Sequence, residues 1–150
     1  AADANSWKAD LMVSIHFNAG GGDGYEALVY NNARVNLGKV FEKHVLAAGQ
    51  NSRGVKVKGY YVLANTNMPA VLTETAFVDN KKDIQDWNEE AELKKMGQAY
   101  AKAAAEYLGL EEKPAKLHRV QVGAYSEIQN AEAMQKKIKA VGFDAFIVKE

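Results

Sequence analysis

The chain has 150 residues, 47% of them hydrophobic and 25% charged, and its 19 basic and 19 acidic residues give a net charge of +0. This balance predicts a soluble globular protein and argues against disorder, against a nucleic-acid partner and against an anionic membrane surface. Because the chain has no cysteine, disulfide bonds and thiolate metal sites are excluded. No apolar run approaches the roughly 20 residues that cross a bilayer, and residues 1–4 lack the features of an export signal.

Strand and helix patterns alternate through about residue 110, which predicts an α/β domain with a mostly parallel sheet flanked by helices. Residues 11–17 form a nearly continuous apolar run, which favours a strand buried on both faces. The glycine-rich residues 18–24 predict a loop after the carboxyl end of this strand. Further strands are predicted at 25–30, 55–57, 60–63 and 70–77.

Two long helices complete this predicted domain. The first begins near Ala33 and ends at Gly49, and its apolar stripe consists of Leu37, Val40, Phe41, Val45 and Ala48. The second is predicted to begin at the N-cap Asn88 and to end at Gly109, with a stripe of Leu93, Met96, Tyr100, Ala104 and Leu108.

A second unit follows a short linker. Residues 111–116 are charged and contain a proline, which is typical of a linker. Residues 117–150 predict a strand at 118–122, a helix with a capping box of Ser126 and Gln129, and a returning strand at 145–148. Because roughly 35 residues rarely fold alone, we interpret this β-α-β piece as the first half of a small α+β domain.

Two titratable residues interrupt the apolar strands of the first domain. His16 lies where residues 11–17 give way to glycines, the place where α/β proteins put their sites, although a lone histidine is more often a hydrogen-bonded core or edge residue. Glu74 interrupts residues 70–77 and is costly to bury unless paired or metal-bound, but an exposed patch at the strand's end explains it equally well. An imidazole and a carboxylate on neighbouring strand ends are parts of a metal-assisted hydrolase.

Two motifs resemble the zinc-dependent N-acetylmuramoyl-L-alanine amidases of the type 3 family. Ser-Ile-His-Phe-Asn-Ala at 14–19 is similar to the segment that supplies a zinc ligand, here His16. Met-Pro-Ala-Val-Leu-Thr-Glu-Thr-Ala-Phe-Val-Asp-Asn at 68–80 is similar to the segment that supplies the catalytic glutamate, here Glu74. The resemblance covers about residues 1–110 and implies the family's fold, with its first strand and helix missing from this chain.

The same resemblance implies a Zn²⁺ cofactor held by two histidines and a glutamate. The family's Gly-His-Gly-Gly motif and the glutamate of the next helix, which carry the other two ligands, are not found in this sequence. His44 and His118 are poor substitutes, because His44 lies in the first long helix and His118 opens the second unit. Asn18 and Glu26 are candidate substrate contacts beside the glycine loop, and structural roles explain them equally well.

The second unit resembles the SPOR domain, a peptidoglycan-binding module. The similarity lies in Arg-Val-Gln-Val-Gly-Ala-Tyr-Ser at 119–126 and Gly-Phe-Asp-Ala-Phe-Ile-Val at 142–148. The resemblance implies binding of glycan strands that lack stem peptides. An amide and an aromatic ring suit sugar hydroxyls and sugar faces, which makes Gln121 and Tyr125 candidate glycan contacts; core or surface roles fit them equally well.

Together these features predict a secreted or cell-wall peptidoglycan hydrolase, from a Gram-positive bacterium or a phage, that cleaves the amide between N-acetylmuramic acid and L-alanine. Peptidoglycan is then the partner, and neither nucleic acid nor membrane insertion is expected. The complete protein is expected to be a monomer. The chain alone is expected to be inactive, because the family's other zinc ligands are missing. The alternative is a non-catalytic peptidoglycan-binding protein with a degenerate amidase domain.

Overall fold

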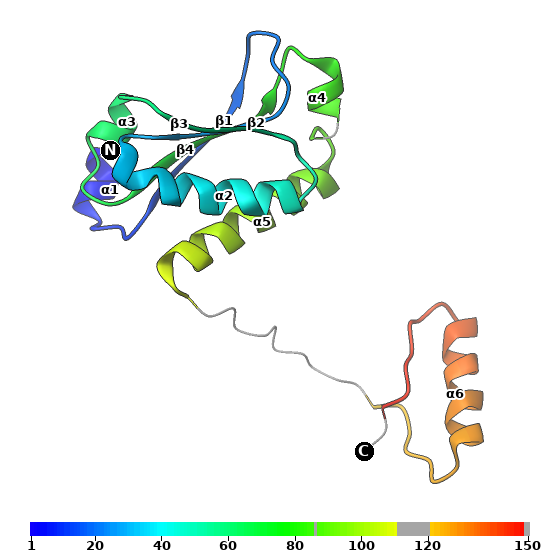
Figure 1. The fold of residues 1–150 in the computed structure, drawn as a ribbon. Coiled ribbons are helices and arrows are strands. Elements are labelled where there is room, and N and C mark those ends of the chain that lie inside the picture. The colour runs from blue at the N-terminus through cyan, green and yellow to red at the C-terminus, as the bar shows by residue number, and fades with distance from the viewer. Residues whose placement is uncertain (86, 111–120, 149–150) are drawn as a thin grey trace. The chain divides into compact units, whose positions relative to one another are not determined.

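The computed structural model describes residues 1–85, 87–110 and 121–148, and it divides into two compact units, Ala1–Glu112 and Lys113–Glu150. The first unit contains a four-stranded sheet (Figure 1), and the order of its strands is β1-β4-β2-β3. Its strands are β1 (Met12–Asn18), β2 (Tyr25–Val29), β3 (Ser52–Val57) and β4 (Ala70–Phe77). Its helical segments are α1 (Ala2–Ser6), the 3₁₀ turn η1 (Asn32–Arg34), α2 (Val35–Ala47), α3 (Tyr61–Ala64), α4 (Lys81–Gln85) and α5 (Glu90–Leu108).

The sheet is mostly parallel, as predicted. β1 pairs with β4 and β2 pairs with β3 in parallel, whereas β2 and β4 run antiparallel. The predicted strand at 70–77 has the same bounds as β4, which lies inside the sheet. The sequence pattern did not predict that the junction between β2 and β4 reverses direction.

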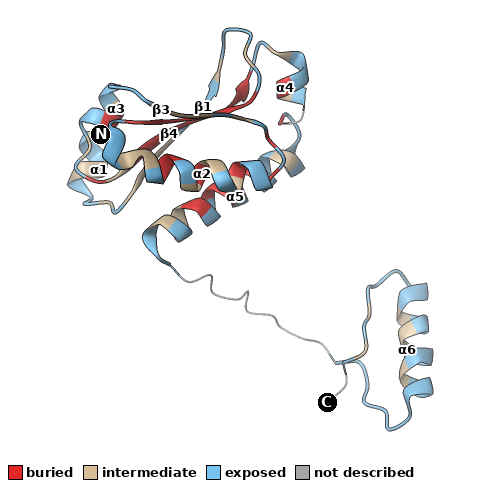
Figure 2. Cartoon of the chain, viewed as in Figure 1, coloured by how far each residue is buried: buried red, intermediate tan, exposed pale blue. Residues whose placement is uncertain are grey.

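One face of the sheet carries the main core, beneath the two long helices α2 and α5 (Figure 2). The predicted stripe of α2 is buried at Leu37, Phe41 and Val45. The helix α5 contributes Met96, Ala99, Tyr100 and Ala103, and the sheet contributes Tyr25, Ala27, Val29 and Val71. The opposite face has a smaller cluster of Leu28, Leu63, Ala70 and Leu72 next to α3. This second face therefore leaves room for polar groups further along the strands.

Three local predictions for the first unit are wrong. β1 is not buried on both faces, because it lies at the edge of the sheet; the side chains of Ile15 and Phe17 are 56% and 40% exposed. The apolar residues 60–63 form the helical turn α3 instead of a strand, a common ambiguity for so short an apolar run. The helix α5 begins one residue later than predicted, with Glu89 at the N-cap instead of Asn88.

The second unit contains one helix, α6 (Ile128–Ala140), where a helix was predicted. No strand is present among the described residues 121–148, so the predicted strands at 118–122 and 145–148 do not form there, and residues 118–120 lie outside the described part. The capping box is also absent, because Glu127 is the N-cap and makes no side-chain capping bond. α6 buries none of its residues, and a β-α-β piece of this size offers too little apolar area to hold two strands together.

The predicted linker at 111–116 lies outside the described residues. Among the described residues, none of the helices combines the length and the hydrophobicity that a membrane crossing requires.

Two helical glycines predict opposite effects on stability. A Cβ on Gly38 in α2 would lie 2.5 Å from Cγ1 of Val55, a stiff side chain of β3, whereas a Cβ on Gly97 in α5 meets no atom within 4 Å. We expect Gly38→Ala to lower the free energy of unfolding by roughly 1–3 kcal/mol through overpacking. Gly97→Ala, the matched control, is expected to raise it by about 0.5–1 kcal/mol because alanine favours the helix. Urea unfolding of both variants measures this, and stabilisation by Gly38→Ala would contradict the close packing of α2 on β3.

Candidate functional site

Register across three strands places His16, Glu74 and Glu26 in one row. His16 of β1 is the pairing partner of Glu74 in β4, and Glu74 is in turn the pairing partner of Glu26 in β2. Paired residues on neighbouring strands project from the same face of a sheet. That face is the one opposite α2 and α5. Leu72 lies two positions before Glu74 and Leu28 lies two positions after Glu26, so each leucine is on the same face as its glutamate, and both leucines belong to the smaller cluster there. The two residues singled out in the sequence therefore lie side by side.

Glu74 carries a carboxylate that the protein stabilises poorly. Its Oε2 atom is buried and has no hydrogen-bond partner among the residues that the structure describes. Burial raises the pKa of Glu74, the charge of nearby Glu26 raises it further, and only the charge of His16 opposes this rise. A carboxyl group whose pKa is raised by burial has the environment expected of a general base or acid.

His16 is exposed at the outer end of the row. Its Nε2 atom lies 2.8 Å from the hydroxyl of Ser14, which is two residues earlier on the same face of β1. This contact orients the imidazole and leaves Nδ1 as the nitrogen available to another ligand.

Glu26 has the opposite environment to Glu74, although the two lie on neighbouring strands. Its side chain is only 9% exposed, and its Oε1 atom accepts hydrogen bonds from Nε of Arg53 at 2.6 Å and from Nζ of Lys56 at 2.5 Å. Burial alone would raise the pKa of Glu26, but the bonds and charges of Lys56 and Arg53 outweigh it and hold that pKa below its ordinary value. Glu26, predicted as a substrate contact, is thus occupied by two cations.

Asp79, which follows β4, holds the glycine loop beside the row. Oδ2 of Asp79 accepts hydrogen bonds from the backbone of Gly20 at 2.7 Å and of Gly21 at 2.9 Å, and these bonds lower the pKa of Asp79. Both glycines have positive φ, and a Cβ on Gly22 would overlap the ring of Phe77. The loop therefore depends on glycine for its conformation and on Asp79 for its position.

Asn18, the other predicted substrate contact near this loop, bonds within it. Its Oδ1 atom accepts a hydrogen bond from the backbone of Ala19 at 2.8 Å, and its carbonyl accepts one from the backbone of Val78 at 2.9 Å. This arrangement gives Asn18 a structural role, while a contact to substrate stays a prediction.

Asp83, in the short helix α4, is the centre of a buried network. Its Oδ2 atom accepts from the backbone of Gly24 at 2.9 Å and of Phe77 at 2.8 Å, and its Oδ1 atom accepts from Nε2 of Gln50 at 2.8 Å. Gln50 also donates to the carbonyl of Thr75. The network ties the glycine loop to the carboxyl end of β4, which fixes the surroundings of Glu74.

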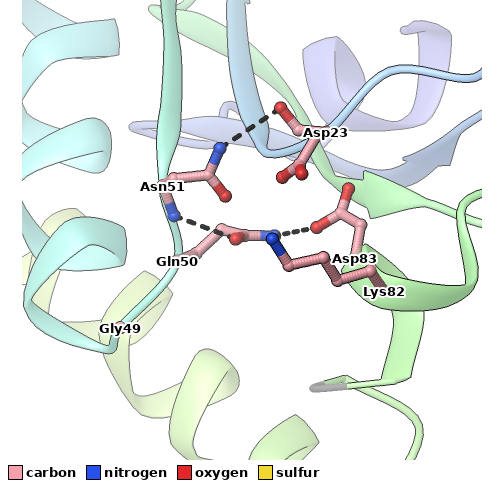
Figure 3. Close-up of a pocket in the computed structure, with 6 residues that line it drawn as sticks. All are labelled: Asp23, Gly49, Gln50, Asn51, Lys82 and Asp83. Carbon is pink, nitrogen blue, oxygen red and sulfur yellow. Dashed lines mark hydrogen bonds between the residues drawn. The ribbon is translucent and has the colours of Figure 1, made fainter.

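The same network forms the wall of a pocket of about 320 Å³ lined by Asp23, Gly49, Gln50, Asn51, Lys82 and Asp83 (Figure 3). Figure 3 shows the amide of Gln50 turned towards the carboxylate of Asp83, and the amide of Asn51 towards the backbone of Asp23. Neither His16 nor Glu74 lines this pocket. Gln50, Asn51 and Asp83 bond one another and the backbone nearby, so this pocket supports the loop and is separate from the row of titratable residues.

His16 and Glu74 supply part of a metal site but do not complete one. An imidazole beside an unpartnered carboxylate oxygen suits a metal ion with its water, yet catalytic zinc takes about three protein ligands. Within the described part of the chain, no group of three or more His, Cys, Asp or Glu side chains is arranged to hold a metal ion. His44 lies on α2 and bonds Glu106 of α5 at 2.7 Å, in the helical layer, and His118 lies outside the described residues.

The predicted glycan contacts belong to the second unit. Gln121 is exposed and its amide donates to the carbonyl of Gly123 at 3.4 Å. The ring of Tyr125 packs close to Gly123, where it would overlap an added Cβ. Both side chains are accessible to a ligand, and their roles stay predictions.

A family model described as N-acetylmuramoyl-L-alanine amidase matches residues 1–106. The chain belongs to this family. The N-acetylmuramoyl-L-alanine amidase CwlM of Bacillus licheniformis is 34% identical over 149 residues, which cover 97% of this chain and 59% of that protein. The sporulation-specific N-acetylmuramoyl-L-alanine amidase of Bacillus subtilis strain 168 is 29% identical over 150 residues, with the same two coverages.

Solved structures of this amidase family share the fold. The catalytic domain of CwlV, an N-acetylmuramoyl-L-alanine amidase from Bacillus (Paenibacillus) polymyxa var. colistinus, superposes with a TM-score of 0.69 and 30% identity, covering 73% of this chain and 64% of that domain. A model of the SPOR domain matches residues 114–150. The two resemblances found in the sequence are therefore confirmed. The chain spans about 59% of the length of the curated relatives described above.

The opposite environments of Glu74 and Glu26 predict opposite effects on stability. Because the folded state raises the pKa of Glu74, the stability associated with this carboxyl falls as the pH rises from its ordinary pKa through the raised one. Glu74→Gln is therefore expected to stabilise the protein at pH 7, by roughly 0.5–1 kcal/mol since water reaches one side of the carboxyl. The gain should shrink as the pH falls below the ordinary pKa of a glutamate, because the carboxyl is then protonated in both the folded and the unfolded state.

Glu26→Gln is the matched control for this experiment. The folded state lowers the pKa of Glu26, so its contribution to stability is present at pH 7 and is lost as the pH falls through the lowered pKa. This variant is expected to be less stable than the unmodified protein at pH 7 and to approach it on acidification. Thermal unfolding of both variants between pH 3 and 8 provides the measurement, and a destabilising Glu74→Gln at pH 7 would contradict the poor stabilisation of this carboxylate.

Proposed function

We propose that the protein is a peptidoglycan hydrolase that cleaves the amide between N-acetylmuramic acid and the L-alanine of the stem peptide, with Glu74 as the general base. The observation that carries this proposal is the buried, unpartnered Oε2 of Glu74 next to the imidazole of His16. Membership of the amidase family supports the choice of substrate bond.

In the proposed reaction Glu74 takes a proton from the attacking water and delivers it to the nitrogen of the leaving L-alanine. Burial raises the pKa of Glu74, and a carboxyl with a raised pKa is a stronger base towards the water and is still able to release the proton to the leaving amine. Glu26 keeps its charge through the neighbouring cations and supplies a fixed negative charge beside Glu74. The contact with Ser14 keeps the imidazole of His16 in place.

We infer that zinc is the cofactor of this reaction and that His16 is one of its ligands, the others coming from residues outside the described set. When bound, zinc polarises the amide carbonyl and acidifies a water molecule. We further propose that the second unit holds the enzyme on glycan strands in the cell wall, with Gln121 and Tyr125 as contacts, because residues 114–150 match the SPOR domain.

A non-catalytic peptidoglycan-binding protein is the second candidate function. The observation that favours it is that the described residues contain no group of three or more potential metal ligands. In such a protein the row on the sheet would bind wall fragments without cleaving them.

Replacing the base separates these two functions. In the full-length protein, Glu74→Gln is expected to lower turnover by roughly 100- to 10,000-fold, since the glutamine cannot accept the proton. The assay measures the free amino groups of L-alanine that are released from purified cell wall, together with the zinc content of the protein. His44→Gln, which changes a side chain in the helical layer, is the control and should keep nearly full turnover. Near-normal turnover of Glu74→Gln would contradict the base role.

The 150-residue chain by itself is expected to bind zinc weakly, because its described residues supply a single imidazole to the site. Calorimetric titration with zinc, with His16→Ala as the comparison, measures this. Tight stoichiometric binding that His16→Ala abolishes would show that the chain completes the zinc site by itself.

A further inference from the structure

A β-bulge in β3 places two cations on the face of the sheet that carries His16 and Glu74. The pairing of β2 with β3 slips between Tyr25 and Ala27, so that Arg53 and Gly54 together oppose Glu26. Gly54 has a φ of 89°, which is typical of the extra residue in such a bulge. Val55 then packs in the core beneath the long helices, and Lys56 returns to the face on which Arg53 contacts Glu26.

The resulting cluster has an excess of positive charge. Arg53 and Lys56 both bond the same oxygen of Glu26, so two cations face one carboxylate. Their side chains are 40% and 37% exposed, whereas that of Glu26 is 9% exposed. A ligand that approaches this face therefore meets the cations and not the glutamate.

The guanidinium of Arg53 is held in a fixed orientation. Its Nε atom is used by Glu26, and its Cζ atom lies 5.2 Å from the centre of the Phe77 ring. No bond of its two terminal nitrogens is present among the described residues. A guanidinium that is fixed in this way presents paired donors, which match a carboxylate in two-point contact.

The geometry points to Arg53, assisted by Lys56, as a subsite for a free carboxylate of the stem peptide. This inference rests on the proposed amidase function, which brings the scissile amide to Glu74. Neighbouring strands lie about 4.8 Å apart, and the cations of β3 reach back over β2 to Glu26, the pairing partner of Glu74, so their charged groups are roughly 5–10 Å from Glu74. At about 3.5 Å per residue, that distance reaches a carboxylate about two residues beyond the cleaved bond, which is the residue after L-alanine.

The chemistry of the substrate favours the peptide over the glycan at this position. The N-acetylated sugars are neutral, and the lactyl carboxyl is consumed in the amide that is cut. Free carboxylates are therefore found on the peptide side of the bond, where amidation removes them. We expect Arg53 to distinguish stem peptides by this modification.

A pair of soluble muramyl peptides tests the inference. One carries a free carboxylate on the residue after L-alanine, and the other has that carboxylate amidated. The full-length protein is expected to prefer the free form by roughly 10- to 100-fold in kcat/KM, the range for a charge-assisted contact. Arg53→Gln should remove the preference by lowering the value for the free form alone. Lys43→Gln, which removes an exposed cation that pairs with Glu106 in the helical layer, should keep it.

A double variant tests whether the role of Arg53 is purely structural. If Arg53 only neutralises buried Glu26, then Glu26→Gln combined with Arg53→Gln restores the preference for the free carboxylate, and the inference is overturned. If Arg53 contacts the substrate, the double variant lacks the preference as well. Thermal unfolding of each variant identifies those that fail to fold, and Arg53→Lys, which keeps the charge next to Glu26, should retain the fold and lose most of the preference.

Binding measured by calorimetry in Glu74→Gln separates this inference from the proposed function. If Glu74→Gln binds the free form selectively but the unmodified protein turns over neither peptide, the subsite is supported and the amidase proposal is refuted. Turnover of both peptides at equal kcat/KM would support the amidase and overturn the subsite.

Discussion

The register of β4 is the constraint on which the site depends. This strand lies between β1, with which it runs parallel, and β2, with which it runs antiparallel, and Glu74 is the position where both pairings meet titratable partners. A shift of one residue in either pairing would send one of those partners to the face beneath α2 and α5. The packing of Leu28 and Leu72 on one face and of Val29 and Val71 on the other opposes such a shift.

The two glutamates of the row show how the same side chain acquires different properties on adjacent strands. Glu74 has a buried oxygen without a donor, whereas Glu26 receives two charged donors on one oxygen. The difference arises from β3, because its bulge at Gly54 turns Arg53 and Lys56 to the same side. A carboxylate left unsatisfied lowers stability, and such groups persist in proteins where they are used. The compensated glutamate keeps its charge, which in turn helps to hold the pKa of Glu74 upward.

Much of this arrangement was predicted from the sequence, because β4, Glu74 and His16 are each marked by the residues next to them in the chain. β4 was predicted with its bounds because an apolar, β-prone run between a proline and polar residues marks a buried strand, and Glu74 is conspicuous within it. His16 was found because it precedes a glycine run. The partners of Glu26 were missed, because a bulge depends on pairing between strands that are distant in the chain. The strands of the second unit were predicted from alternation, but without an adequate core that pattern did not produce a sheet in the described residues.

The glycine loop beside the row is shaped by side chains that it does not itself contain. Asp79 and Asp83, some sixty residues later in the chain, bond the backbones of Gly20, Gly21 and Gly24. The conformation of the loop backbone is therefore fixed by side chains from a second segment of the chain. Transplanting residues 18–24 into another protein would carry over the flexibility of the glycines without their conformation. The unit that can be exchanged between related proteins is the pair of segments, 18–24 together with 77–83.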